Sequence, residues 1–335
     1  MSEKTIEQIR PDLFRVEIPL PRNPLKATNS YIIKSAQRNL IIDTGMNREE
    51  CSSVMQKALA ELSIDLKKTD IFVTHLHADH VGLVEELSTR DTLVYFNQPD
   101  ADILNQKGLW EFVNLVASKH GFPAGQVEKA IDSHPGQRYS PVNPVDFKMV
   151  SDGDEIEYGD YKLQCIATPG HTGGHTCLYE PNLKYFFSGD HILNDITPNI
   201  STWQDDCNPL GDYFKSLDRV STMSVDLVLP GHRRLINDCR IRIDQLKEHH
   251  AQRLEEVLDI LKSKSPRSAF EVASLMTWDL TADSWDDFPL MQKWFATGEA
   301  LAHICFLEAE GKVKRGMSGQ TIVFYRKMID KSSKK

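Results

Sequence analysis

Residues 74–80 read Thr-His-Leu-His-Ala-Asp-His, and the apolar run that precedes them, Asp-Ile-Phe-Val-Thr at residues 70–74, predicts a buried strand. Four side chains of this heptapeptide can bind a metal ion: His75, His77, Asp79 and His80. A strand end fixes such ligands in place before the ion arrives. Residues two apart in extended backbone point to one face, so the first two histidines can hold one ion. The other two ligands, in the turn beyond, can reach a second ion.

The first half of the chain alternates strand-like and helix-like patterns of apolar residues. Strands are expected at residues 14–18, 30–34, 39–43, 70–74 and 93–96, and helices at residues 48–62 and 81–87. From residue 147 onward, short apolar segments separated by turns imply a second sheet. Its strands are expected at residues 148–150, 155–158, 162–167, 176–179, 184–187 and 226–229. This order of elements predicts a layered α/β (α+β) domain.

Two segments outside these strands help to divide the chain. Residues 98–146 are less regular, with a helix-like pattern at residues 108–117. They indicate an insertion that either covers a pocket or forms an ordinary packed helical excursion. Residues 238–263 form the longest clear helix, with apolar residues every three to four positions. The polar residues that follow, ending at Pro266, mark a domain boundary.

The C-terminal segment has the outline of a winged-helix domain. A short helix is expected at residues 269–276 and a longer one near residues 290–310, with Gly311 as its C-cap. A two-stranded hairpin follows at residues 312–326. We therefore predict two domains: residues 1–262, with the insertion at about residues 98–146, and a winged-helix-like domain at residues 266–330.

The composition is that of an ordinary soluble globular protein, with 40% hydrophobic and 26% charged residues. Apolar runs stay short of the roughly 18 residues that a membrane span needs, and the N-terminus has no apolar signal-peptide core. A cytoplasmic location is therefore expected. The six cysteines are scattered without a Cys-x-x-Cys pair, which predicts free thiols and a metal site built from histidine and aspartate.

Further metal-competent side chains follow other expected strands. They are Asp43 in Asp-Thr-Gly, His171 in a glycine-rich turn, Asp190 in Ser-Gly-Asp-His and His232 in Pro-Gly-His-Arg. Each candidate lies at the carboxyl end of its strand. Ligands gathered at one edge of a sheet sandwich can converge in space although they are far apart in the sequence.

This series of motifs resembles the metallo-β-lactamase-fold hydrolases, and most closely the glyoxalase II type, over roughly residues 12–235. The resemblance implies a four-layer αββα sandwich with the metal ions at one edge. It implies a first ion held by His75, His77 and His171, and a second ion held by Asp79, His80 and His232. Asp190 would bridge the two ions, and Asp43 would orient the ligands without binding an ion itself.

Five imidazoles and two carboxylates form a ligand set that suits zinc and also accepts iron or manganese. Two divalent ions about 3.5–4 Å apart can share a hydroxide, because zinc lowers the pKa of bound water from near 15.7 to about 7. This hydroxide would attack an acyl carbon or a phosphorus, and the ions would stabilise the developing oxyanion. Asp79 is the best candidate to orient the nucleophile or to pass its proton.

Residues beside the predicted ligands have weaker interpretations. His175 and His191 are expected to support the ligands or to line the pocket, because seven ligands already fill the site. Arg233 and Arg234 follow His232, and they either receive an anionic group of the substrate or form an ordinary surface pair.

Three functions remain open. The first is hydrolysis of a small ester, thioester or lactone, which the glyoxalase-like ligand set favours. The second is a metal-dependent ribonuclease, because a branch of this fold with a winged-helix-like C-terminal domain cuts RNA. The hairpin segment is also basic, with eight Lys/Arg against one Asp in residues 311–335. The third is a nucleic-acid-binding or scaffold protein with a vestigial metal site, which the intact ligand set disfavours.

The charge distribution favours the first function. The formal net charge is -9, and residues 266–335 carry +1, so the first 265 residues carry -10 and would repel a phosphate backbone unless charge is locally segregated. Aromatic side chains of the C-terminal segment are expected to pack over the active-site mouth or to mediate a homodimer: Trp285, Phe288, Trp294 and Phe295. We therefore expect a small-molecule substrate, with RNA as the alternative, and no membrane partner.

Overall fold

The structure is a computed structural model that describes residues 5–204, 207–263, 265–279, 282 and 284–327. The chain divides into two compact units. The sandwich unit comprises residues 1–107, 135–198 and 215–244, and the helical unit comprises residues 108–134, 199–214 and 245–335. The predicted domain boundary at residues 262–266 lies inside the helical unit, and the predicted insertion is shared between the two units.

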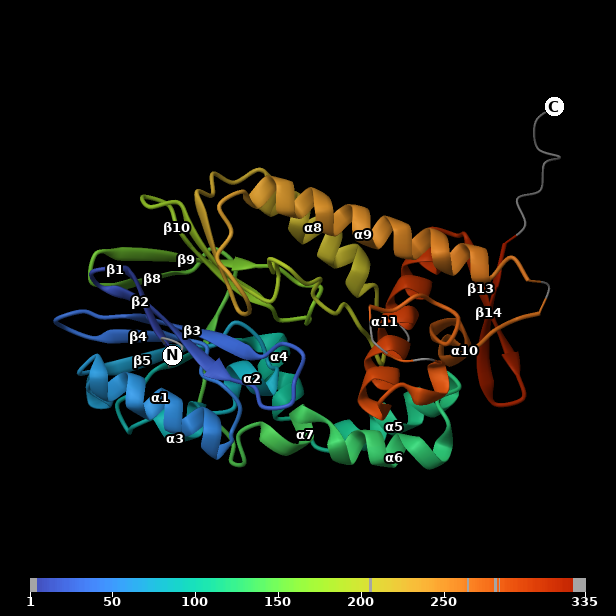
Figure 1. Ribbon diagram of the computed structural model, residues 1–335, viewed down its shortest axis with the longest axis horizontal. Helices are drawn as coiled ribbons and strands as arrows, with labels where there is room; N and C mark the ends of the chain where they lie inside the picture. Colours follow the sequence, from blue (N-terminus) through green and yellow to red (C-terminus); the bar gives the residue numbers. More distant parts are fainter. Residues whose placement is uncertain (1–4, 205–206, 264, 280–281, 283, 328–335) are drawn as a thin grey trace. The chain divides into compact units, whose positions relative to one another are not determined.

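The first sheet of the sandwich unit has seven strands in chain order, and Figure 1 labels β1 to β5 among them. They are β1 (Ile6–Arg10), β2 (Leu13–Pro19), β3 (Ala27–Ile33), β4 (Asn39–Ile42), β5 (Thr69–Phe72), β6 (Val94–Asn97) and β7 (Lys148–Val150). Strands β1 to β4 are antiparallel, whereas β4 to β7 are parallel. Parallel strands have their carboxyl ends at the same edge, so the residues that follow β4 and β5 emerge side by side.

The second sheet has five strands in the order β12, β11, β10, β9 and β8. They are β8 (Glu155–Tyr158), β9 (Tyr161–Ala167), β10 (Thr176–Glu180), β11 (Tyr185–Gly189) and β12 (Leu227–Pro230). Strands β11 and β12 are parallel, with Phe187 opposite Leu229. Asp190 and His232, which follow these two strands, therefore emerge at one edge of this sheet.

The two sheets pack face to face over a shared apolar core. The rings of Tyr31 and Phe187, one from each sheet, meet edge to face with centroids 5.5 Å apart. Helix α1 (Glu49–Glu61) packs on the other face of the first sheet, in a separate apolar core. Helix α8 (Pro209–Ser221) packs on the second sheet's side, where Ser216 Oγ donates to the carbonyl of Pro169 at 2.8 Å. The predicted four-layer αββα fold is confirmed.

The chain after β5 differs from the single helix expected at residues 81–87. Two short helices occur instead, α2 (Ala78–Val81) and α3 (Val84–Leu87). The break has a physical cause, because Leu83 donates its backbone N–H to the carbonyl of Gly45 at 3.0 Å and not to the preceding helical turn. Asp79 and His80, expected in a turn beyond the strand, consequently lie on a helical turn that begins at Ala78.

The segment at residues 98–146, expected to be less regular with one helix-like stretch, is largely helical. It forms α4 (Gln98–Leu104), α5 (Leu109–Lys119), α6 (Ala124–Ser133) and α7 (Pro135–Tyr139). The prolines and glycines that suggested irregular chain mark helix starts: Gly108 and Pro123 are N-cap residues, and Pro135 is the first residue of α7. Proline suits a helix start because its missing N–H would be unpaired there in any case.

The helical unit joins α5 and α6 to the C-terminal elements. These are α9 (Cys239–Ile260, from residue 245), α10 (Ala269–Ala273), α11 (Leu290–Ala309), β13 (Val313–Ser318) and β14 (Thr321–Arg326). A capping box of Ser268 and Glu271 starts α10, and Gly311 ends α11 with a φ of 69°. The predicted order of two helices and a hairpin is confirmed. The winged-helix class of this segment stays a prediction.

Trp294 of α11 lies in the core of the helical unit. Its side chain is 1% exposed and contacts Trp203 and Phe122, with ring centroids 4.3 and 5.3 Å away. Aromatic contacts of this kind stabilise a core by more than the burial of apolar surface alone. Trp294 therefore cannot form a dimer surface, which was one of the two roles expected of the C-terminal aromatic residues.

A charged network links α9 and α11 in the helical unit. The Glu299 side chain is 12% exposed, accepts a hydrogen bond from Asn199 Nδ2 at 3.0 Å and lies 3.8 Å from Arg253 Nε. Arg253 also donates to Glu256 at 2.6 Å. Burial raises the pKa of Glu299 to about 7, although Arg253 and Asn199 act in the opposite direction.

Replacing Glu299 with glutamine should flatten the pH dependence of unfolding. The unfolded chain ionises this carboxyl near its ordinary pKa of 4.5, so between that value and about 7 the folded chain holds a proton that the unfolded chain has lost. The free energy of unfolding therefore falls as the pH rises through this range, and it levels off above. Glutamine is neutral at every pH. Thermal unfolding of Glu299→Gln from about pH 5 to 8 should thus vary less than that of the wild type.

Glu310, exposed at the end of the same helix, supplies the matched control. The Glu310→Gln protein should keep the wild-type slope of Tm against pH. Equal slopes for Glu299→Gln and the wild type would contradict the assignment of this pH dependence to Glu299.

All six cysteines lie in the described part of the chain, and each is a free thiol, as predicted. Burial raises the pKa of the Cys165 thiol to about 12, so thiolates are disfavoured there. Among the residues that the structure describes, no helix combines the length and the apolar character needed to cross a membrane.

Candidate metal centre

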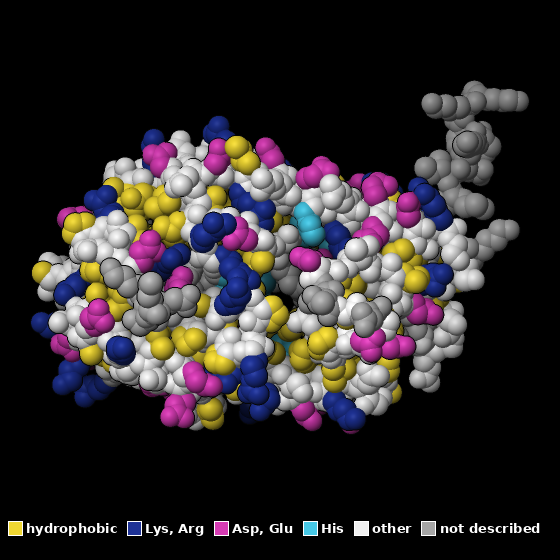
Figure 2. Space-filling view, viewed as in Figure 1, with side chains coloured by type: hydrophobic (Ala, Val, Ile, Leu, Met, Phe, Trp, Pro, Cys, Tyr) yellow, Lys and Arg dark blue, Asp and Glu magenta, His cyan; other side chains and the backbone are white. Residues whose placement is uncertain are grey.

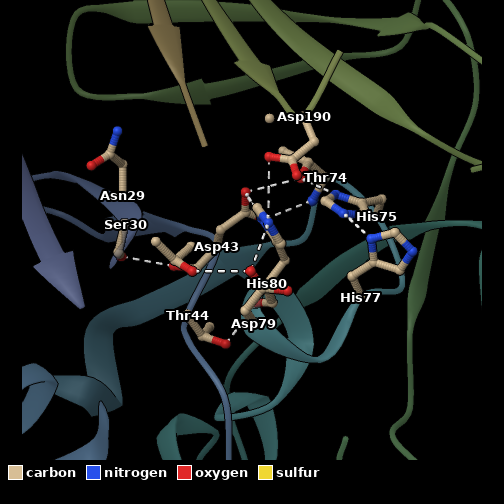
Figure 3. A network of polar contacts seen from close by, with 12 residues as sticks. Asn29, Ser30, Asp43, Thr44, Thr74, His75, His77, Asp79, His80 and Asp190 are labelled. Carbon is tan, nitrogen blue, oxygen red and sulfur yellow. Dashed lines mark hydrogen bonds and ion pairs between the residues drawn. The ribbon is translucent and has the colours of Figure 1, made fainter. Parts of the chain in front are cut away.

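The seven predicted metal ligands converge at one edge of the sandwich unit. Figure 3 labels His75, His77, Asp79, His80 and Asp190 among them. Strands β5, β9, β11 and β12 lead into the segments that carry them. The ligand atoms form three overlapping groups, each within 4.8 Å: His75 with His77 and His171, His75 with His80 and Asp190, and Asp79 with His80 and His232. The strand-end pattern of the sequence therefore corresponds to a cluster in space. The assignment of each residue to an ion stays a prediction.

The first group consists of three imidazoles. His77 Nδ1 lies 3.0 Å from His75 Nε2 and 3.0 Å from His171 Nε2. His75 is fully buried and His171 is 8% exposed, whereas His77 is half-buried. Three ring nitrogens that face one point, with no thiolate among them, are donors that suit a divalent transition metal.

Asp79, His80 and His232, called the second group from here on, combine imidazoles with a carboxylate. His232 Nε2 lies 3.3 Å from Asp79 Oδ2, and His80 Nε2 lies 3.7 Å from the same oxygen. Asp190 adjoins both groups, because its carboxylate lies 3.3 Å from His232 Nε2 and 3.5 Å from His171 Nε2. This placement agrees with the bridging position expected for Asp190.

Buried atoms without hydrogen-bond partners test whether the cluster fits a metal ion. Within the described residues, the buried atoms that make no hydrogen bond include His80 Nε2, His232 Nε2 and Asp190 Oδ1. Each belongs to a predicted ligand and faces the cluster. Polar atoms buried without partners are costly and rare in folded proteins, and lone pairs of this kind bind cations. The residues present therefore fit divalent metal ions.

The pKa values of the histidines shift in opposite directions in the two groups of ligands. Burial opposes ionisation of His80 and His232, but the surrounding carboxylates outweigh it, raising the pKa of His80 to about 9 and that of His232 well above its ordinary value. Against burial, His232 and His80 hold the pKa of Asp190 well below its usual range. Burial and the neighbouring His171 lower the pKa of His77 to about 3. Without a bound ion, His77 is thus held neutral, whereas His80 and His232 hold protons that a cation must displace.

Asp43 lies behind the ligands and holds them. Its carboxylate accepts hydrogen bonds from the backbone N–H of Thr74 at 2.8 Å and from Thr74 Oγ1 at 2.9 Å, and it lies 2.8 Å from His80 Nδ1 (Figure 3). The φ of Asp43 is 60°, a left-handed conformation that non-glycine residues rarely adopt. Strain of this kind persists only where the surroundings enforce it. The geometry agrees with the predicted orienting role of Asp43.

Strand β3 supports the second group, which sequence reasoning missed. The carbonyl of Ala27 lies 2.7 Å from His232 Nδ1, and Thr28 Oγ1 donates to Asp79 Oδ2 at 3.3 Å. Asn29 Nδ2 donates to the carbonyl of Pro230 at 2.8 Å. One signal was available in the sequence. Three consecutive polar residues, Thr-Asn-Ser at 28–30, begin an otherwise apolar strand and are all buried.

The two histidines beside the predicted ligands occupy supporting positions. His175 Nδ1 lies 2.8 Å from Thr168 Oγ1, and its Nε2 accepts the backbone N–H of Asp190 at 3.1 Å. His191 is fully buried, with its ring 6.2 Å from that of His175. Neither belongs to the three groups of converging ligand atoms.

The two arginines after His232 have protein partners. Arg233 Nη2 donates to the carbonyl of Pro24 at 2.7 Å, and Arg234 pairs with Asp195 at 2.8 Å on the surface. Arg234 is thus an ordinary surface residue with an acidic partner. Arg233 fixes the loop before β3.

Comparison with known families identifies the family of this chain. Residues 23–232, more than half of the chain, match the metallo-beta-lactamase superfamily. The chain belongs to the metallo-β-lactamase superfamily. Residues 254–328 match a second family, described as the metallo-beta-lactamase-like C-terminal domain. The resemblance inferred from the motifs is confirmed, and the protein is a metallo-β-lactamase superfamily hydrolase.

Individual relatives agree with this membership. A probable metallo-hydrolase of Bacillus subtilis is 26% identical over 329 residues, which cover 93% of this chain and 97% of that protein. An atrochrysone carboxyl ACP thioesterase of Emericella nidulans is 25% identical over 253 residues, covering 76% and 66%. Among solved structures, a metallo-beta-lactamase family protein of Thermus thermophilus is 28% identical with a TM-score of 0.81, covering 96% of this chain and all of that one.

Proposed function

We propose that this superfamily member is a hydrolase whose cluster binds two divalent ions, with zinc as the expected metal, and acts on a small ester, thioester or lactone. The observation that carries the proposal is the position of Asp190 between two complete groups of donors. Its carboxylate lies within 3.6 Å of ring nitrogens of His171, His80 and His232. These donor groups would hold the two ions, and Asp190 is placed to contribute to both.

Bound divalent ions supply two kinds of chemistry in such a site: they make water a nucleophile at neutral pH, and they offset negative charge on the oxygen of an attacked carbonyl. The chain's own residues orient the reactants. Asp79 Oδ2, held by Thr28 Oγ1 at 3.3 Å, is the carboxylate that orients the nucleophilic water or takes its proton. Asp43 fixes the ring of His80, so the second group keeps its geometry during turnover.

Three observations support a small acyl substrate over RNA. The Emericella nidulans relative is named as a thioesterase, an enzyme class that cleaves an acyl compound. The net charge of the chain is -9, which disfavours binding of a phosphate backbone. On the face viewed in Figure 2, outside the grey residues, basic and acidic side chains are interspersed over the surface and do not form one basic field.

The ribonuclease alternative rests on the hairpin of β13 and β14. Lys312, Lys314 and Lys327 are exposed there, and Lys314 lies opposite the exposed ring of Tyr325. Exposed cations beside an aromatic ring can bind single-stranded nucleic acid. Arg315 of the same hairpin is already paired with Glu308 at 2.7 Å, which reduces the free positive charge.

The deciding experiment assays thioester and lactone panels beside single-stranded RNA. A truncation after Ser263 is unsuitable, because apolar residues of α9 share a core with α10 and α11. The hairpin is tested instead by replacing Lys312, Lys314 and Lys327 with serine in the full chain. We expect acyl substrates to turn over equally in both proteins. RNA cleavage that depends steeply on salt and is lost in the serine variant, without acyl turnover, would overturn the proposal.

A further inference from the structure

A single carboxylate joins the two loops that supply the first group of ligands. Asp100, the third residue of α4, is fully buried. Its Oδ2 accepts the backbone N–H of Leu76 at 2.9 Å and the hydroxyl of Thr172 at 2.7 Å. Its Oδ1 accepts the backbone N–H of Gly174 at 2.7 Å.

The three donors to Asp100 lie close in sequence to the predicted ligands of the first group. Leu76 lies between His75 and His77, and Thr172 directly follows His171. Asp100 therefore ties the loop after β5, from the first sheet, to the loop after β9, from the second. The three imidazoles of the first group come from these two loops alone, so their spacing depends on how the loops are held together.

We propose that Asp100 is a positioning residue that sets the geometry and affinity of the site formed by His75, His77 and His171. This inference rests on the proposed metal centre. Residues that orient ligands typically contribute 10- to 100-fold, as an order of magnitude, to metal affinity. Asparagine would be a poor substitute at this position, because all three partners of Asp100 donate hydrogen bonds. An amide NH₂ in place of either oxygen would face a donor.

Gly174 allows the same contact to be disturbed from the opposite side. A Cβ atom there would lie 2.7 Å from both the backbone nitrogen and Oδ1 of Asp100, a distance at which something must move. A Cβ atom on the adjacent residue, Gly173, would meet no described atom of another residue within 4 Å. The pair Gly174→Ala and Gly173→Ala therefore differs in whether the methyl group meets Asp100.

Asp70 supplies the matched control for loss of a buried carboxylate. It is 1% exposed and accepts hydrogen bonds from the backbone N–H of Leu93 at 2.8 Å, from Tyr158 at 2.7 Å and from Arg38. None of these partners is a neighbour in sequence of a predicted ligand. Asp70→Asn should therefore weaken the fold without a selective effect on one ion.

The test measures metal binding in the full-length protein, separately from activity. Metal-free protein is titrated with Zn²⁺ against a competing chelator, and with Co²⁺ to follow the visible spectrum of each site. We expect two ions in the wild type. In Asp100→Asn and Gly174→Ala, one ion should bind about 10- to 100-fold more weakly, with an altered Co²⁺ spectrum, while the other is retained. Asp70→Asn and Gly173→Ala should bind both ions as the wild type does.

The outcomes separate this inference from the proposed function. A wild-type chain that binds no ion would refute the metal centre itself. A wild type with two ions, together with Asp100→Asn and Gly174→Ala proteins of unchanged affinities and spectra, would overturn only the role of Asp100. Equal weakening of both ions in Asp100→Asn and Asp70→Asn would also overturn it, because the effect would then be general. If Asp100→Asn does not fold, Gly174→Ala carries the test.

Discussion

Replacing Asp190 with alanine should reduce the metal content from two ions per chain to at most one and lower hydrolysis by roughly 10³-fold or more. The reason is geometric, because the Asp190 carboxylate lies within 3.6 Å of imidazoles from both donor groups. Its loss leaves His80 and His232 with Asp79 but without the carboxylate that also adjoins the first group, and it removes the carboxylate beside His171. Elemental analysis of purified protein and steady-state kinetics on the best acyl substrate provide the measurement.

Asp195 supplies the control for this replacement. It lies five positions further along the chain, pairs with Arg234 on the surface at 2.8 Å and belongs to none of the three donor groups. The Asp195→Ala protein should retain both ions and full activity. Full two-ion occupancy in Asp190→Ala would show that Asp190 does not bridge the ions, and the roles of the two groups would have to be reassigned.

The edge where the predicted ligands gather could be located from the sequence because these residues follow a local rule. A buried apolar run that ends in a metal-competent side chain is visible within about ten residues, and it recurs before His75, Asp190 and His232. Parallel strands then bring such ends to one edge. The same local rule does not predict the break between α2 and α3. That break depends on a hydrogen bond to Gly45, which lies far away in the sequence.

The residues behind the ligands lacked any such signal. Asp100 follows an ordinary strand and sits near a proline, and its partners lie 24, 72 and 74 positions away. No periodicity marks a contact of that kind. Thr28 was within reach of prediction, because a buried polar run must find hydrogen-bond partners. Its partner Asp79, however, could be known only after the sheets had been assembled.

The segments that make up the helical unit could not be predicted from the sequence, for a similar reason. Residues of α6, such as Val127 and Ile131, share a core with Trp294 of α11, which lies more than 160 positions later. Each helix alone shows only an apolar stripe, and a stripe does not identify its partner. The predicted boundary at residues 262–266 followed the polar composition of that stretch. The packing of α9 against α10 and α11 places the stretch inside a unit.

Removal of the metal ions by a chelator should lower the Tm on the order of 10 °C and abolish hydrolysis. An ion at about 1,000 times its Kd stabilises the folded state by roughly 4 kcal/mol, which corresponds to a shift of this size in a unit of about 200 residues. The structure gives the reason for the stabilisation. Without ions, buried nitrogens of His80 and His232 have no hydrogen-bond partner, whereas the unfolded chain offers no preformed site.

The His77→Ala protein is the control for chelation, since His77 Nδ1 lies 3.0 Å from both other members of the first group. Its Tm should respond less to chelator than that of the wild type. A wild-type Tm and activity unchanged after verified removal of metal would contradict the metal centre. Reconstitution then identifies the ion, because imidazole donors rank Mn²⁺ and Fe²⁺ below Zn²⁺ in affinity. Recovery of activity with Zn²⁺ at the lowest free concentration is expected, and recovery with Mn²⁺ or Fe²⁺ alone would exclude zinc as the active ion.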